Sequence, residues 1–201
     1  MNKKITKVFI IILAWLALIY PLLVRIQTLQ WDFNLDTWSL NLFPLFGLIA
    51  FILLWFHSLC GVFEDWLKEY IDFDWFVHVT SIIILICIIA HPLLLFIGMD
   101  FSISNIFFYY GARSLWFVII AWLLLISYDV GKMLKKYNFF AKNWHNILAI
   151  SNIGFLMTFF HSLILGSDLQ SGPLKYIWIF YGTTAIMAIT YTYGIKRFVI
   201  K

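Results

Sequence analysis

Long apolar stretches separated by short polar segments are the dominant pattern along the chain. The uncharged runs are continuously apolar and do not alternate between apolar and polar residues. A helix of about 20 mainly apolar residues crosses a bilayer, whereas alternation is typical of membrane β-strands. The pattern therefore predicts an all-α integral membrane bundle of six helices, over about residues 8–25, 43–62, 76–97, 112–131, 145–165 and 176–195.

Composition supports this prediction and excludes a soluble protein. The chain has 201 residues, of which 63% are hydrophobic and 12% are charged. Soluble domains average about 45–50% apolar and about 25% charged residues. A soluble fold of this length could not bury so much apolar surface. We therefore expect one membrane domain over residues 1–201, and we interpret the basic net charge as a sign of topology and not of nucleic-acid binding.

The basic residues predict an orientation. If both termini are cytoplasmic, three of the 14 Lys and Arg residues lie outside, namely Arg25, Arg113 and Lys175. The other eleven lie inside, as the positive-inside rule requires. They are Lys3, Lys4, Lys7, Lys68, Lys132, Lys135, Lys136, Lys142, Lys196, Arg197 and Lys201. We expect a multi-pass protein of a bacterial plasma membrane, in contact with membrane lipid.

Segment 64–74 is unusual because it holds half of the ten acidic residues. Apolar residues recur there at a spacing of three to four, which predicts a short amphipathic helix in the membrane interface. The alternative is an acidic docking surface for a cytoplasmic partner.

The five histidines are the most informative polar residues, because ionisable groups in a membrane span are functional candidates. His78 and His91 lie on the third predicted helix, and His145 and His161 lie on the fifth, which runs in the same direction. Each helix thus has an inner and an outer imidazole. Two stacked haems with two axial histidines each would use this arrangement. The 13 positions between His78 and His91 correspond to roughly 20 Å of helix.

Spacing also raises objections to this pairing. Thirteen positions do not return to the same face of a straight helix, and His145 and His161 are 16 positions apart, which offsets the inner pair by about one turn. Any of the histidines, above all His57, could instead be an interhelical hydrogen-bond partner. His57 could also replace an inner ligand. Cys60 and Cys87 are expected to pack as small apolar residues.

Two segments resemble the ferric reductase-like transmembrane domain family. "FVHVTSIIILICIIAHPLLLFIG" is similar to the family's third helix, and "NWHNILAISNIGFLMTFFHSLILGSDL" is similar to its fifth. The family includes the membrane domains of NADPH oxidases and ferric reductases, and the haem subunit of periplasmic methionine sulfoxide reductase. The resemblance covers nearly the whole chain.

The resemblance implies haem b held by His78, His91 and His161, which match the family positions. The fourth family histidine would fall at Leu148, and His145 is the nearest replacement, so one or two haems are expected. The implied function is an oxidoreductase-type electron-transfer component that passes electrons outward. It would lack its own flavin and nicotinamide domains. Its donor would be a separate flavoprotein reductase or a quinol, and its acceptor ferric iron, oxygen or an exported redox protein.

Several further expectations complete this hypothesis. Thr80, Ser81 and Ser162 could hydrogen-bond the second nitrogen of a ligand. Arg113 and Lys175 could pair with haem propionates or anchor the protein at the interface. The alternative function is a haem-free, six-helix substrate-binding subunit of a vitamin importer, which would have no need of paired histidines.

Overall fold

The computed structural model describes residues 3–29 and 34–196, and every regular element in them is helical. The long helices are α1 (Lys3–Gln27), α2 (Leu35–Leu67), α3 (Phe73–Gly98), α5 (Ala112–Met133), α7 (Trp144–Leu165) and α8 (Gly172–Ile189). The short elements are α4 (Ile103–Tyr110), α6 (Asn138–Lys142), the 3-10 turn η1 (Ser167–Leu169) and the π-helical segment η2 (Thr190–Ile195). The predicted all-α class is confirmed.

Five of these helices, α1, α2, α3, α5 and α7, are long and apolar enough to cross a membrane. They coincide with the first five predicted spans and indicate a multi-pass membrane protein. The sixth predicted span falls on α8 and its continuation η2. The 18 residues of α8 include Pro173, Lys175 and two threonines, and α8 is not among the five candidate spans.

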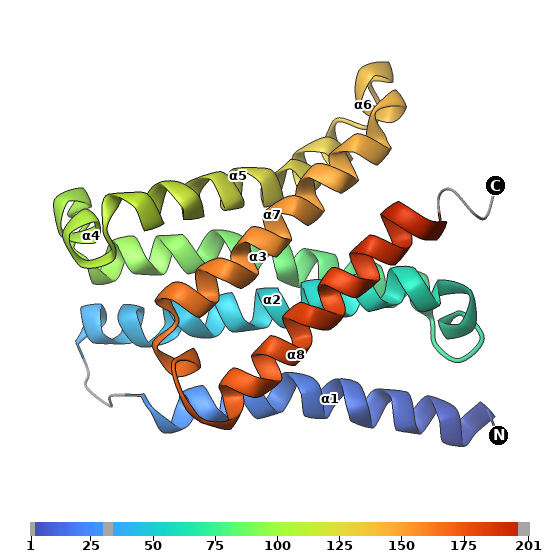
Figure 1. The fold of residues 1–201 in the computed structure, drawn as a ribbon, viewed down its shortest axis with the longest axis horizontal. Coiled ribbons are helices and arrows are strands. Elements are labelled where there is room, and N and C mark those ends of the chain that lie inside the picture. Colours follow the sequence, from blue (N-terminus) through green and yellow to red (C-terminus); the bar gives the residue numbers. More distant parts are fainter. Residues whose placement is uncertain (1–2, 30–33, 197–201) are drawn as a thin grey trace.

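The helices form an elongated bundle with two distinct ends (Figure 1). The start of α1, the turn between α2 and α3, the short helix α6 and the end of η2 lie at one end. We call it the basic end, because most of the lysines are there. Helix α4 and η1 lie at the other end, which we call the α4 end. An ion pair of 3.8 Å between Lys3 and Glu69 joins the start of α1 to the α2–α3 turn.

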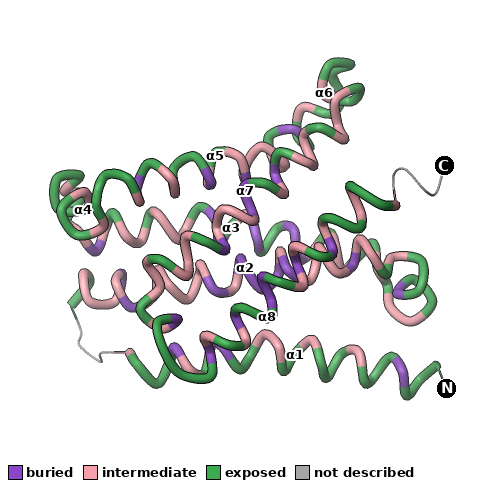
Figure 2. The backbone as a smooth tube through the Cα atoms, viewed as in Figure 1, coloured by how far each residue is buried: buried purple, intermediate pink, exposed green. Residues whose placement is uncertain are grey.

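Helix α2 occupies the middle of the bundle and supplies much of the core. It packs along α3 and also contacts α1, α7 and α8, while α5 packs along α7. Figure 2 shows buried backbone concentrated in this centre, whereas α1 is mostly exposed. At Phe51, aromatic rings from α7 and α8 meet the α2 side chain, with Trp178 at 4.3 Å and Phe155 at 5.1 Å between ring centroids.

Close approach of α5 and α7 depends on a glycine. A Cβ atom at Gly154 would lie 2.5 Å from the backbone nitrogen of Leu125. Any side chain there would push the two helices apart, because backbone atoms cannot yield as a flexible side chain can. This pair therefore holds one wall of the bundle at a fixed separation.

The amphipathic helix predicted for segment 64–74 is present only as a short piece that ends at Leu67. This piece follows the main part of α2 across a kink at Phe63, whose φ and ψ of −103° and 18° are not helical. A turn follows, and α3 begins at Phe73 after the N-cap Asp72, whose side chain accepts a hydrogen bond from the Trp75 nitrogen.

Candidate functional site: two cavities inside the bundle

The larger cavity brings together two of the predicted ligands, His91 on α3 and His161 on α7. We call it the histidine cavity. It lies toward the α4 end, and its empty space is about 1330 Å³, part of which is open to the outside. Its walls are mainly apolar side chains of α2, α3, α5, α7 and α8, with Trp122 and Trp178 among them. A buried apolar space with a few convergent polar groups is typical of a cofactor site.

Two contacts fix the ring of His91. Its Nδ1 donates a hydrogen bond of 2.6 Å to the carbonyl oxygen of Phe43, so the neutral ring carries its lone pair on Nε2. Gly47 makes room for the ring, because a Cβ atom there would lie 2.9 Å from both Cε1 and Nδ1 of His91. A carbonyl partner on one nitrogen is the usual arrangement for a histidine that binds metal through the other.

His161 has an imidazole nitrogen that the protein leaves unsatisfied. Its Nδ1 is buried and has no hydrogen-bond partner among the described residues. A buried polar atom without a hydrogen-bond partner destabilises the fold. Where such an atom lies in a cavity wall, a bound ligand can supply the missing partner. His161 and His91 thus present imidazoles to one space from two different helices.

These residues fit a haem. Two neutral imidazoles from facing helices are the donor set of a b-type haem, and the apolar walls suit a porphyrin. The described part of the chain contains no group of three or more His, Cys, Asp or Glu side chains able to hold a metal ion. A haem does not need such a group, because the porphyrin supplies four nitrogens and the protein supplies only the axial ligands.

A buried ion pair lies beside the cavity at the α4 end. Arg25 Nη1 lies 3.3 Å from Asp168 Oδ1, and both side chains are 11% exposed. Arg25 also donates to the carbonyl oxygen of Asn41 at 3.2 Å. Asp168 itself lines the histidine cavity. The pair therefore ties α1 and α2 to the connection that follows His161.

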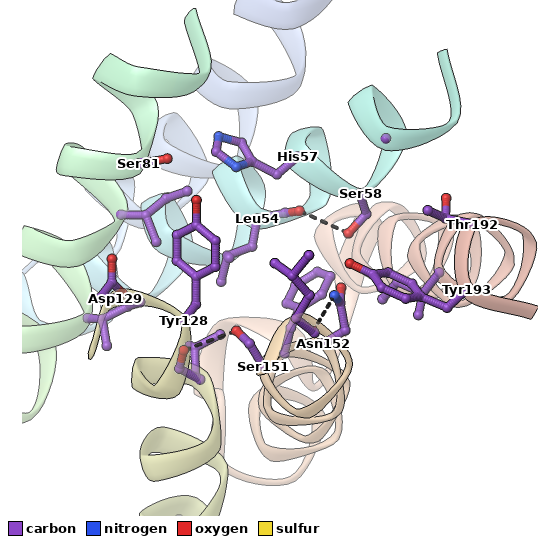
Figure 3. A pocket seen from close by; sticks show the side chains of 17 residues that line it. Leu54, His57, Ser58, Ser81, Tyr128, Asp129, Ser151, Asn152, Thr192 and Tyr193 are labelled. Carbon is purple, nitrogen blue, oxygen red and sulfur yellow. Dashed lines mark hydrogen bonds between the residues drawn. The ribbon is translucent and has the colours of Figure 1, made fainter. Parts of the chain in front are cut away.

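The second cavity is more polar and lies toward the basic end. We call it the polar cavity; its empty space is about 870 Å³. Figure 3 shows polar side chains on two sides of it, with His57 between them. On one side are Ser81, Tyr128 and Asp129, and on the other are Ser58, Asn152 and Tyr193.

Leu54, Ile88 and Leu125 line both cavities. The two cavities are therefore stacked along the bundle and separated by one layer of apolar side chains.

His57 is held by α3 and presents one nitrogen for other contacts. The Thr80 hydroxyl donates its single proton to the carbonyl oxygen of Phe76, at 2.6 Å. The 2.7 Å contact between His57 Nε2 and Thr80 Oγ1 is therefore donated by His57. This assigns the neutral tautomer that keeps the lone pair on Nδ1.

The inner histidines predicted as ligands, His78 and His145, line neither of the two cavities, and His78 is exposed. The His145 ring lies 5.4 Å from the ring of Tyr193. Leu148, at the position that the family resemblance assigns to a fourth histidine, does line the polar cavity. The only histidine among the described residues lining that cavity is His57.

The predicted partners of the ligands make other contacts. Thr80 binds His57, the Ser81 hydroxyl donates to the carbonyl oxygen of Val77, and Ser162 accepts a 2.7 Å hydrogen bond from Trp178. Arg113 is exposed, and Lys175 donates to the carbonyl oxygen of Gln170. Both cysteines are buried and free, as expected for packing residues.

Sequence reasoning overlooked the groups that complete these cavities. Gly47 carries no sequence signal, because a glycine in an apolar helix has many explanations. Asp129 could have been found, since it is an isolated carboxylate at the end of a predicted span. Asn152 and Tyr193 lie in apolar segments of the sequence, which gives no sign that the fold brings them together on one wall of the polar cavity.

Comparisons of the chain with protein-family models, with curated proteins and with solved structures find no match.

Proposed function

We propose that this protein is a haem b-containing transmembrane electron-transfer subunit, in which His91 and His161 are the axial ligands of a haem in the histidine cavity. The observation that carries the proposal is the pair of imidazoles lining one apolar cavity from two helices. The His91 ring is already oriented, and the His161 nitrogen lacks a partner. The resemblance to ferric reductase-like domains supports the same pair.

When bound, the haem supplies one-electron redox chemistry, since its iron alternates between the ferric and ferrous states. The residues of the protein hold and orient it. Phe43 and Gly47 fix the plane of the His91 imidazole, and the hydrogen bond to the Phe43 carbonyl increases the basicity of the ligating nitrogen. Trp122 donates to the carbonyl oxygen of Ile88 at 3.0 Å and so fixes an aromatic wall. The apolar lining excludes water from the site.

The proposal includes a topology and a direction of transfer. Six spans, with α8 and η2 as the sixth, place both termini and the basic end in the cytoplasm of a bacterium, in accordance with the positive-inside rule. The histidine cavity then lies in the outer half of the membrane. Electrons would come from a flavoprotein reductase or a quinol and would leave to an acceptor outside, such as ferric iron, oxygen or an exported redox protein.

The test is the visible spectrum of protein purified from haem-replete cells. We expect a Soret band that shifts on dithionite reduction, and its loss in His91→Ala and in His161→Ala. His78→Ala and His145→Ala are the matched controls and should keep the band. A colourless wild-type preparation would refute the proposal, as would a band that survives both cavity substitutions.

A further inference from the structure

We propose that the polar cavity is a binding and oxidation site for a membrane hydroquinone, which donates electrons to the haem of the histidine cavity. This inference rests on the proposed function for its electron acceptor. The binding site itself is argued from the polar cavity alone.

The cavity matches an aromatic ring with two opposed hydroxyl groups. Its polar side chains form two clusters on opposite sides, Ser81, Tyr128 and Asp129 facing Ser58, Asn152 and Tyr193 (Figure 3). Apolar and aromatic side chains, including Phe155 and Ile84, line the space between. Such walls favour a flat apolar ring, and the clusters provide hydrogen bonds for a hydroxyl at each end of it.

The location of the cavity in the bundle suits a lipid-soluble molecule. The lining residues belong to α2, α3, α5 and α7, which are long and apolar enough to cross a membrane, and to α8 and η2. A hydroquinone dissolves in the bilayer and can reach the space between these helices from the membrane. A second haem is disfavoured, because His57 is the only imidazole among the described residues of the lining.

Asp129 and His57 are placed to accept the protons. None of the ion pairs within residues 3–29 and 34–196 includes Asp129. A carboxylate of this kind in a membrane helix is a functional candidate. His57 donates through Nε2 to Thr80 and keeps its Nδ1 lone pair. A bound hydroquinone therefore has two proton acceptors in the cavity lining, Asp129 from α5 and His57 from α2.

The stacked cavities provide a route for both the protons and the electrons that hydroquinone oxidation releases. Oxidation of one hydroquinone to the quinone breaks two O–H bonds and releases two protons and two electrons. The protons pass to Asp129 and His57 and then to water at the basic end. The electrons would cross the layer of Leu54, Ile88 and Leu125 one at a time toward a haem held by His91 and His161. The final oxidant would be a ferric chelate, and two of these chelates would be reduced to the ferrous form for each hydroquinone oxidised.

Photolabelling tests binding without using redox activity. A decyl benzoquinone carrying an azide would be cross-linked to the purified protein, and labelled peptides would be identified by mass spectrometry. We expect label at Tyr128, Asn152 or Tyr193 or their immediate neighbours, and competition by unlabelled decyl benzoquinone. Label spread over the lipid-facing helices without competition would overturn the proposal.

Kinetics test whether the bound ligand donates electrons. Decyl benzohydroquinone would be mixed with ferric protein, and haem reduction would be followed at the α band. Tyr193→Phe and Asn152→Leu should each slow reduction by about three- to tenfold, the equivalent of one lost hydrogen bond. Tyr191→Phe and Asn146→Leu, at exposed positions on the same elements, should not. Equal slowing in both sets would overturn the proposal.

Two measurements separate failure of this inference from failure of the proposed function. His91→Ala protein that lacks haem should still be labelled in the polar cavity. Labelling of the cavity in wild-type protein that contains no haem would refute the proposed function and leave the binding site in place. Two haems per chain, one of them lost in His57→Ala, would show that the polar cavity holds haem, and would overturn the inference alone.

Discussion

One hydrogen bond at His91 determines the orientation of the buried imidazole and which of its nitrogens keeps a lone pair. Because Nδ1 is bound to the carbonyl oxygen of Phe43 at 2.6 Å, the ring cannot rotate freely and its lone pair stays on Nε2. The ring also packs against the backbone of α2 at Gly47, where no side chain intervenes. The position of the ligand is therefore set by α2, although the histidine belongs to α3.

The role of Gly47 can be tested by adding one methyl group. In Gly47→Ala the new Cβ would lie 2.9 Å from two atoms of the His91 ring, so the ring must move. Changes in the groups that orient a metal ligand typically cost about 10–100-fold in affinity, and we expect a loss of haem affinity in this range, measured by haem titration of the apo-protein.

The matched control is Gly61→Ala on the same helix. Its nearest neighbour atom would lie 3.8 Å away, an ordinary van der Waals distance. Haem affinity should be unchanged there. A Gly47→Ala protein with wild-type haem affinity would show that α2 does not position the ligand.

At the scale of elements, the connection after α7 is held by a buried charge pair. Arg25 at the end of α1 bonds Asp168 in η1 and the carbonyl oxygen of Asn41 in α2. The consecutive helices α1 and α2 thus meet η1, which is distant in sequence, at one guanidinium group. Because Asp168 lines the histidine cavity, this contact also sets the shape of the cavity near His161.

Breaking this pair should cost far more than breaking an exposed one. Asp168→Asn leaves the Arg25 charge buried without its partner, and we expect a loss of about 3 kcal/mol in the free energy of unfolding. Glu64→Gln removes the partner of Lys68, where both side chains are more than 40% exposed, and should change the free energy of unfolding far less, because water screens the pair. Unfolding in detergent micelles, followed by circular dichroism, measures both. Equal losses would mean that the Arg25–Asp168 pair is effectively solvated.

At the scale of the whole molecule, the two cavities define a path along the bundle. The histidine cavity lies toward the α4 end and the polar cavity toward the basic end, with three shared apolar residues between them. If the basic end is cytoplasmic, the proposed electron transfer runs from the inner half of the membrane to the outer half. The direction of transfer therefore depends on the orientation of the chain.

Single cysteines test that orientation. Both native cysteines are buried, so an added one at an exposed position reports its own side of the membrane. Ser104→Cys on α4 should react with a membrane-impermeant maleimide in intact cells. Asn138→Cys on α6 should react only after the cells are opened. The reverse pattern would place the basic end outside and reverse the proposed direction of electron flow.

The sequence by itself determined the helical class and the position of five membrane-length helices, because long apolar runs can satisfy their backbone hydrogen bonds in a bilayer only as helices. The resemblance together with the placement of His91 and His161 also predicted the pair that lines one cavity. The kink at Phe63 could not be predicted, since the apolar spacing in the acidic segment indicates a helix but not how that helix joins the preceding span.

Only the tertiary structure decided which polar residues face the interior. Spacing along one helix gives no information about the rotation of that helix against its neighbours, and this rotation leaves His78 exposed while it turns His57 and Leu148 toward the polar cavity. Asp129, Asn152 and Tyr193 meet there from three elements that are not consecutive. Such sites arise from packing between helices, so they become visible only once the helices are assembled.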